Sequence, residues 1–182
     1  MPQPNPSQPH HTFTLSLITY DRGPHPLTNL PRPHHWAYFL DPPSPPPSSG
    51  VSGFDRGAGS ETETSRGTVF QLRGMPGGFY YPGPEWLDVK DGGVVVGRLE
   101  VGEVRRHKVV GEGDGMDGGW DAMAGVVKMI DGVLRDVEVV EDENVAWNCQ
   151  DWALEGLERL KGAGVVYEYL EREGVRAWLK ER

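Results

Sequence analysis

Residues 41–67 contain almost no apolar side chains, and this stretch limits how much of the chain can fold into a core. It has five prolines and eight serines or threonines. So little apolar surface does not offset the entropy lost when the backbone becomes ordered. We therefore expect a flexible insertion at 41–67. Residues 1–11 also lack hydrophobic periodicity and are expected to be a disordered tail, which leaves residues 12–182 as one domain that carries the insertion.

Apolar patterns on both sides of the insertion predict the strands of a sheet. Residues 12–20 alternate between apolar and polar side chains, and residues 34–40 form a short run rich in aromatic residues. Both patterns are typical of strands. The sheet is expected to be mainly antiparallel, with four or five strands. Further strands are predicted at residues 68–74, within residues 77–83 and at residues 94–104, the last being one bent strand or two short strands broken at Gly97.

The C-terminal third of the chain has the apolar spacing of helices, so the expected fold class is α+β. Residues 120–134 and 148–164 both repeat apolar side chains every three to four positions. Asn148 is a competent N-cap for the second helix, and Gly162 or Gly164 is its expected end. The other segments are read as a short edge strand or helical extension at residues 136–143, and as an amphipathic helix or a helix pair interrupted near Gly174 at residues 167–182.

The charge and hydropathy of the chain argue against several classes of partner. The formal net charge is −9, and the lysines and arginines are scattered instead of forming a stripe. The attraction to phosphate that nucleic acids and anionic membranes require is therefore not visible. No apolar run approaches the length of a membrane span, and the N-terminus lacks the segments of a signal peptide. We expect a cytoplasmic protein without nucleic-acid or integral membrane partners; the oligomeric state stays open.

The single cysteine and one glycine-rich loop bear on metals and cofactors. Cys149 is the only cysteine, which excludes an intrachain disulfide and a cysteine-cluster zinc site. Residues 111–119 lack the lysine–serine/threonine ending of a phosphate-binding loop, and Met116 stands where a calcium loop needs a ligand. We expect neither a metal nor an organic cofactor.

Two interpretations of Cys149 stay open. On a helix the thiol shares a face with Trp152, Ala153 and Leu157, so it can be a small buried hydrophobic residue. In the first turn of the helix, however, free backbone N–H groups and the positive end of the helix dipole stabilise a thiolate or an oxyanion. A nucleophile at this position is expected to gain acidity.

A nucleophilic thiol needs a base, which is usually a histidine. His34 and His35 open the aromatic-rich strand, where successive side chains point to opposite faces. Ala37 shares a face with His35, and its small side chain is expected to let a helix approach closely. We therefore favour His35 as the base and place His34 nearer to solvent. The remaining histidines are expected to be solvated, namely His10, His11, His25 and His107.

Three segments together carry a resemblance to a known family. They are "HHWAYFL", "GTVFQLRG" and "NCQDWALEGLERL", with the matching pieces "H-W-A" and "N-C-x-x-[FW]". This order resembles the circularly permuted papain-like fold, in which the histidine strand precedes the cysteine helix. Members include lecithin:retinol acyltransferase-like proteins, PPPDE-type deubiquitinase-like peptidases and permuted NlpC-type endopeptidases, and the order also resembles that of a group of uncharacterised fungal proteins. The resemblance implies an antiparallel sheet of four to five strands packed against the helix that carries Cys149.

The resemblance also implies a cysteine–histidine dyad whose thiolate attacks a carbonyl carbon. A polar residue on the strand after the histidine strand completes the site, and here that strand offers Gln71, in register with Val69 and Arg73. Relatives often carry histidine at this position. A neutral amide orients an imidazole by hydrogen bonding but stabilises its charged form less than a carboxylate does. The other interpretation of Gln71, an exposed strand residue, stays open.

Several residues near the reactive pair are candidates for substrate binding. The aromatic segment around Tyr80 and Tyr81 lines a substrate cleft or packs onto the core. Gln150 follows the cysteine and either adds a donor near an oxyanion or lies on the surface. The full set of expected substrate contacts is Trp36, Tyr80, Tyr81, Gln150 and Trp152.

The function expected from these residues is thiol-dependent hydrolysis or acyl transfer at an amide, isopeptide or ester. The substrate would be a peptide or a small acyl or amide compound. Cys149 would be the nucleophile, His35 the general base and then the general acid, Gln71 the orienting group, and the Cys149 backbone N–H part of the oxyanion hole. Two alternatives remain: a catalytically inert papain-like module that binds a peptide or small molecule, and an unrelated α+β protein with a structural cysteine.

Overall fold

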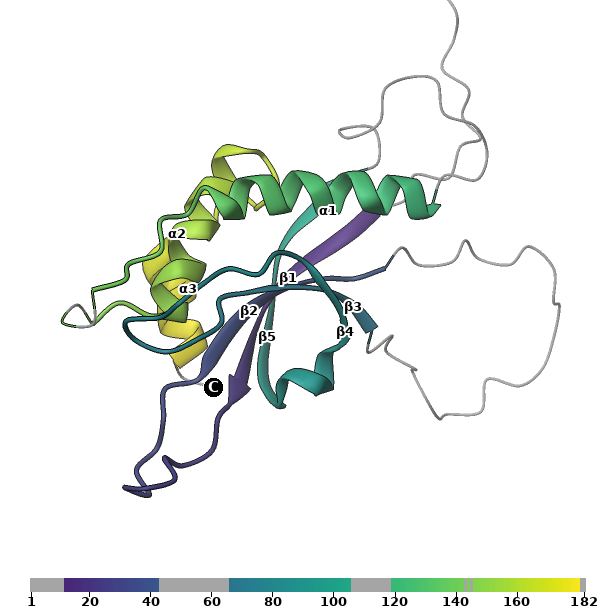
Figure 1. Ribbon diagram of the computed structural model, residues 1–182. Coiled ribbons are helices and arrows are strands. Elements are labelled where there is room, and N and C mark those ends of the chain that lie inside the picture. The colour runs from purple at the N-terminus through teal and green to yellow at the C-terminus, as the bar shows by residue number, and fades with distance from the viewer. Residues whose placement is uncertain (1–11, 43–65, 106–118, 143, 145, 181–182) are drawn as a thin grey trace, which may run out of the picture.

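The computed structural model describes residues 12–42, 66–105, 119–142, 144 and 146–180. Within them, three α-helices and a five-stranded sheet form an α+β fold (Figure 1). All neighbouring strands pair antiparallel, which confirms the predicted α+β class and the predicted antiparallel sheet of four or five strands. The expected tail at 1–11 and most of the insertion expected at 41–67 lie outside the described residues.

The sheet has the strand order β4-β3-β2-β1-β5. Its strands are β1 (Thr12–Asp21), β2 (His35–Leu40), β3 (Arg66–Gln71), β4 (Glu85–Asp88) and β5 (Val94–Arg105). β2 is the central strand, and it begins at His35, opposite Tyr20 of β1. Gln71, the last residue of β3, lies opposite Ala37. This antiparallel register brings the beginning of β2 and the end of β3 to the same end of the sheet.

The fourth strand lies later in the chain than the sequence predicts. Where a short strand is expected, within residues 77–83, the backbone makes only an isolated bridge between Arg73 and Tyr80. Gly77 and Gly83 have positive φ values of 80° and 99°, a conformation that interrupts extended backbone. The strand that pairs with β3 is β4, and it places Glu85 opposite Val69.

β5 is one bent strand, which agrees with the first of the two predicted alternatives. Its pairing with β1 shifts register twice, between Leu15 and Ser16 and between Thr19 and Tyr20. Bulges of this kind bend a strand and increase its twist. At Gly102 the strand touches the backbone that follows the second helix, because a Cβ at this position would lie 2.0 Å from the carbonyl oxygen of Val165.

The helices are α1 (Gly119–Arg135), α2 (Cys149–Gly162) and α3 (Arg172–Lys180), with a short 3-10 helix η1 (Val89–Gly92) after β4. Asn148 caps α2 as predicted: its side chain accepts a hydrogen bond from the backbone N–H of Gln150, and Asp151 accepts one from the N–H of Asn148. None of the described helices is both long and apolar enough to cross a bilayer.

The prediction for residues 136–143 is wrong, and of the two alternatives for residues 167–182 the single amphipathic helix agrees with α3. Residues 136–142 form neither a strand nor a helix. There the chain turns after α1 and anchors itself by burying Val137 in the core. α3 runs through Gly174 without interruption. The low helix propensity of glycine is outweighed because Val175 and Leu179 are buried and hold the helix against the core.

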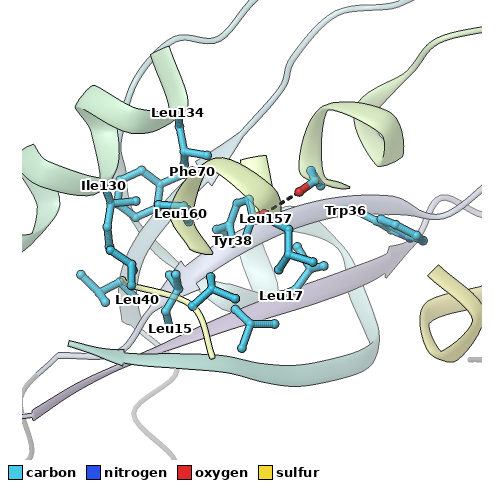
Figure 2. Packing of buried hydrophobic residues seen from close by; sticks show 14 of the residues in the cluster. Leu15, Leu17, Trp36, Tyr38, Leu40, Phe70, Ile130, Leu134, Leu157 and Leu160 are labelled. Carbon is cyan, nitrogen blue, oxygen red and sulfur yellow. Dashed lines mark hydrogen bonds between the residues drawn. The ribbon is translucent and has the colours of Figure 1, made fainter. Parts of the chain in front are cut away.

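All three helices cover one face of the sheet (Figure 1). In the main core, α2 is fixed on β2 by a polar contact and by a close approach. The hydroxyl of Tyr38 donates a hydrogen bond to the backbone carbonyl of Ala153 (Figure 2). A Cβ at Gly156 would lie 2.8 Å from the Leu134 side chain and 3.3 Å from the Tyr38 hydroxyl, so glycine permits this approach. The core residues labelled in Figure 2 are Leu15, Leu17, Trp36, Tyr38, Leu40, Phe70, Ile130, Leu134, Leu157 and Leu160.

The opposite face of the sheet carries a smaller apolar cluster. It consists of Ile18, Tyr20, Ala37, Phe39 and Val69, with Leu87 and Val89 packed against it. Ala37 therefore faces away from α2, and so does His35, which shares its face and stacks on Tyr20. The expectation that the small side chain of Ala37 lets the cysteine helix approach, which is the reason for favouring His35 over His34, is wrong. Because side chains alternate along a strand, Trp36 and Tyr38 face the helices instead, and Gly156 of α2 supplies the space.

The glycine contacts predict opposite effects for two alanine substitutions. Gly102→Ala is expected to lower the free energy of unfolding by about 2 kcal/mol or more, because the new methyl group meets a backbone carbonyl that has no room to move. Gly132→Ala is the matched control: a methyl group on this helical glycine would meet nothing within 4 Å, so alanine should raise stability by roughly 0.5–1 kcal/mol. Urea unfolding of both variants measures these changes, and equal stability of the two would contradict the packing described.

Candidate functional site

A cleft of about 390 Å³ lies at the end of the sheet where β2 begins. Three of the residues that line it are the three predicted catalytic residues: Cys149 from α2, His35 from β2 and Gln71 from β3. The segment after β3 forms much of the wall, and one residue comes from η1. The complete lining is Arg22, His35, Gln71, Leu72, Arg73, Gly74, Phe79, Tyr80, Gly92 and Cys149.

Cys149 contributes a thiol to the cleft, and the residue is 5% exposed. Burial raises the pKa of this thiol above its ordinary value, while the backbone N–H of Trp36 and the positive charge of Arg22 lower it and offset part of the rise. The backbone N–H of Cys149 at the start of the helix does lower this pKa, as expected, but the gain in acidity is smaller than the effect of burial. Desolvation of the thiolate outweighs the stabilising N–H groups and charges.

The imidazole of His35 is bound through one ring nitrogen. Its Nε2 lies 3.0 Å from Oε1 of Gln71. An amide oxygen only accepts hydrogen bonds, so Nε2 carries the ring proton and Nδ1 keeps its lone pair. The ring also stacks on Tyr20, with 6.1 Å between ring centroids. Burial lowers the pKa of His35 below its ordinary value; the hydrogen bond that His35 donates to Gln71 opposes this change, and the charges of Arg22 and Arg73 add to it.

Gln71 is itself held in place by a carboxylate on the neighbouring strand. Its side-chain amide donates from Nε2 to Oε2 of Glu85 at 3.2 Å, and Oε1 of Glu85 pairs with Arg73 at 2.9 Å. Because a carboxylate accepts and does not donate, Glu85 turns the amide nitrogen of Gln71 toward itself and the amide oxygen toward His35. Gln71 is 7% exposed, so the interpretation as an exposed strand residue is wrong.

Gln150 connects the start of α2 to the start of β2. Its Nε2 donates to the backbone carbonyl of His34 at 3.0 Å. One of its two amide hydrogens is therefore engaged in a structural contact, and Gln150 is not among the residues that line the cleft. The same contact holds Cys149 and His35 at one end of the fold.

The predicted aromatic substrate contacts divide into one in the cleft and three outside it. Tyr80 lines the cleft and is 54% exposed. Trp36 and Trp152 are fully buried on the helix side of the sheet. Tyr81 packs on Trp152 and donates a hydrogen bond from its hydroxyl to Asp131. Trp36 and Trp152 therefore belong to the core, and Tyr81 packs against it.

Two residues of the site, Glu85 and Arg22, are not identified from the sequence. Glu85 is missed because the fourth strand is predicted within residues 77–83, and only the observed β4 brings this carboxylate beside Gln71. Arg22 lies in a proline-rich segment that is read as a loop, yet it lines the cleft. The alternation of Glu85, Trp86 and Leu87 after a glycine and proline turn is the signal that would have located β4.

Comparison of the chain with protein-family models, with curated proteins and with solved structures found no match. The chemistry of the cleft therefore carries the functional argument. In the described part of the chain, no group of three or more histidine, cysteine, aspartate and glutamate side chains has the arrangement to hold a metal ion.

The hydrogen bonds of Gln71 predict the tautomer of His35 and its dependence on Glu85. In the wild-type protein, NMR ring-nitrogen shifts of neutral His35 should show the proton on Nε2. Glu85→Gln should move a measurable fraction of the ring to the Nδ1–H tautomer, because a glutamine can donate to Gln71 and turn its amide over. Glu100→Gln is the matched control, since Glu100 also accepts one hydrogen bond on a strand, from Tyr167. A proton on Nδ1 in the wild-type protein would contradict the assignment.

Proposed function

We propose that the protein is a thiol-dependent hydrolase or acyltransferase that acts on the carbonyl of an amide, an isopeptide or an ester, with its strand and helix arranged as in permuted papain-like proteins. One observation carries the proposal: Cys149 at the start of a helix and His35 at the start of a strand line the same cleft, and His35 is hydrogen-bonded to Gln71. A nucleophile, a base and an orienting group are the parts that acyl transfer to a thiol requires. The substrate is a peptide or a small acyl or amide compound.

Without substrate, the cleft contains a neutral thiol and a neutral imidazole. Burial raises the pKa of Cys149 and lowers the pKa of His35, so both uncharged forms are favoured. A buried thiolate–imidazolium pair would have to overcome the desolvation of two ions. His35 therefore acts as a general base through Nδ1 and removes the thiol proton as the sulfur attacks, a role that contributes roughly 10²- to 10⁴-fold to a rate.

The first chemical step forms a bond between Sγ of Cys149 and the carbonyl carbon, and the thiol proton moves to Nδ1 of His35. The oxyanion of the tetrahedral intermediate accepts a hydrogen bond from the backbone N–H of Cys149 at the positive end of the α2 dipole. When the C–N or C–O bond breaks, His35 gives the proton to the leaving nitrogen or oxygen. Water or another acceptor then attacks the thioester, its proton passes to His35, and the sulfur leaves and takes that proton.

Gln71 and Glu85 act on the reaction through His35. Gln71 keeps the ring in the tautomer whose Nδ1 accepts a proton, and Glu85 keeps the amide oxygen of Gln71 toward the ring. Glu85 is therefore a positioning residue. As His35 becomes charged during the reaction, the amide oxygen of Gln71 stabilises the imidazolium, although less than a carboxylate would.

The two competing functions use the same residues differently. An inert module of the same fold would bind its peptide or small molecule in the cleft, with the exposed Tyr80 as a contact, and the thiol would not be acylated. A purely structural cysteine would not require a nearby base, such as His35, whose tautomer is fixed. The fixed orientation of His35 by Gln71 and Glu85 favours the enzyme.

Acylation of the single thiol by para-nitrophenyl acetate tests the proposal without knowledge of the natural substrate. The native wild-type protein should form an acetyl thioester on Cys149, seen by mass spectrometry, together with an initial burst of para-nitrophenol. His35→Ala should slow acylation by roughly 10²- to 10⁴-fold because the general base is lost. His34→Gln is the matched control and should react like the wild type, because the His34 side chain is not part of the cleft lining.

Two outcomes would overturn the proposal. If His35→Ala is acylated as fast as the wild-type protein, the thiol reacts without a base and the dyad is wrong. If Cys149 is acylated only after denaturation, the cysteine is structural. Circular dichroism of each variant separates a chemical effect from a loss of folding.

A further inference from the structure

The mouth of the cleft contains a cation that no acidic side chain neutralises in the described part of the chain. Arg22 follows β1 directly, is exposed and lines the cleft together with Cys149 and His35. The ion pairs formed by described residues involve five other cationic side chains. The guanidinium of Arg22 is therefore available to a bound molecule.

The backbone that carries Arg22 is held in place. The guanidinium of Arg32 donates to the carbonyl oxygen of Arg22, and its Nε donates to the carbonyl oxygen of Gly23 at 3.2 Å. Asp21 accepts a hydrogen bond from the N–H of Gly23 at 2.8 Å. These contacts fix the turn at the end of β1, so the backbone of Arg22 is held in one position at the rim of the cleft.

Two other charged residues that act on Cys149 or His35 have ion-pair partners. Arg73 pairs with Glu85 at 2.9 Å, and Asp151 pairs with Arg176 at 3.1 Å. Arg22 has no such ion-pair partner among the described residues. Its charge acts on both reactive groups, because it lowers the pKa of Cys149 and that of His35. Because the formal net charge of the chain is −9, a local positive charge of this kind distinguishes the cleft as a place that attracts an anion.

We infer that the substrate carries an anionic group, a carboxylate or a phosphate, close to the carbonyl that Cys149 attacks, and that Arg22 pairs with it. This inference rests on the proposed function, because it names the class of substrate for that site. A guanidinium is suited to this role since its planar fork binds the two oxygens of a carboxylate or phosphate. Tyr80 and Phe79 line the same cleft and provide apolar surface for the rest of the substrate.

Two alkylating reagents of nearly equal size test the inference on the full chain. Iodoacetate carries a carboxylate and iodoacetamide carries a neutral amide, and both modify the one thiol. The rate of iodoacetate at Cys149 is divided by the rate of iodoacetamide, and the result is divided by the same ratio for free cysteine. This normalised ratio should exceed one in the wild-type protein. Arg22→Gln should lower this normalised ratio by roughly three- to tenfold, the size expected for a charge pair near a surface. Added salt should reduce the wild-type preference, because it screens exposed charges.

Arg159→Gln is the control with the same change in net charge. Arg159 is exposed in the last turn of α2, at the opposite end of the helix from Cys149, so the ratio should not change. An unchanged ratio in Arg22→Gln, or no preference for iodoacetate in the wild-type protein, would overturn the inference. His35→Ala separates the two proposals: if it leaves the absolute rates unchanged while the anion preference persists, the catalytic proposal fails and the anion site stands.

Discussion

The junction between α2 and β2 is the contact on which the rest of the molecule depends. At its outer end, Gln150 binds the backbone carbonyl of His34. Further in, the hydroxyl of Tyr38 binds the carbonyl of Ala153, and Gly156 lets the helix sit close to the strand. These contacts lie along one line from the cleft into the core. They make the first residue of the helix and the first residue of the strand neighbours of one cleft, although the two residues are far apart in the sequence.

Burial gives this site its electrostatic character. The start of a helix favours a thiolate, but the desolvation of Cys149 is the larger effect, and desolvation likewise disfavours a charged His35. The result is a cleft in which the uncharged forms of Cys149 and His35 are both favoured. The polar chain from Arg73 through Glu85 and Gln71 to His35 orients the ring, since each member fixes the orientation of the next.

The parts of the fold that depend on local pattern could be predicted from the sequence. The alternation in β1 and the cap of α2 at Asn148 are examples, because each is decided by residues close together in the chain. What the sequence could not supply are the relations between distant segments. The expectation for Ala37 places it on the wrong side of the sheet, because alternation along a strand says which residues share a face but not which face the helix covers.

The same limit explains the incomplete prediction of the site. Cys149, His35 and Gln71 stand in recognisable local patterns, and all three line the cleft. Glu85 and Arg22 become part of the site only through pairing with other strands and loops, so no short sequence motif identifies them. The energetic balance at Cys149 is also beyond sequence reasoning, because burial depends on the complete packing of the cleft and not on the position of the residue in its helix.

The central claim is that the Cys149 thiol and the His35 imidazole are both neutral and that each affects the titration of the other. The most direct test is an NMR titration of His35 in the wild-type protein and in Cys149→Ser. The ring of wild-type His35 should protonate with a pKa below its ordinary value of about 6.5, and its resonances should shift a second time at alkaline pH, when Cys149 ionises above its own ordinary value. The second step should vanish in Cys149→Ser. A His35 ring that is already charged at neutral pH, or one that shows no trace of the cysteine titration, would contradict the account.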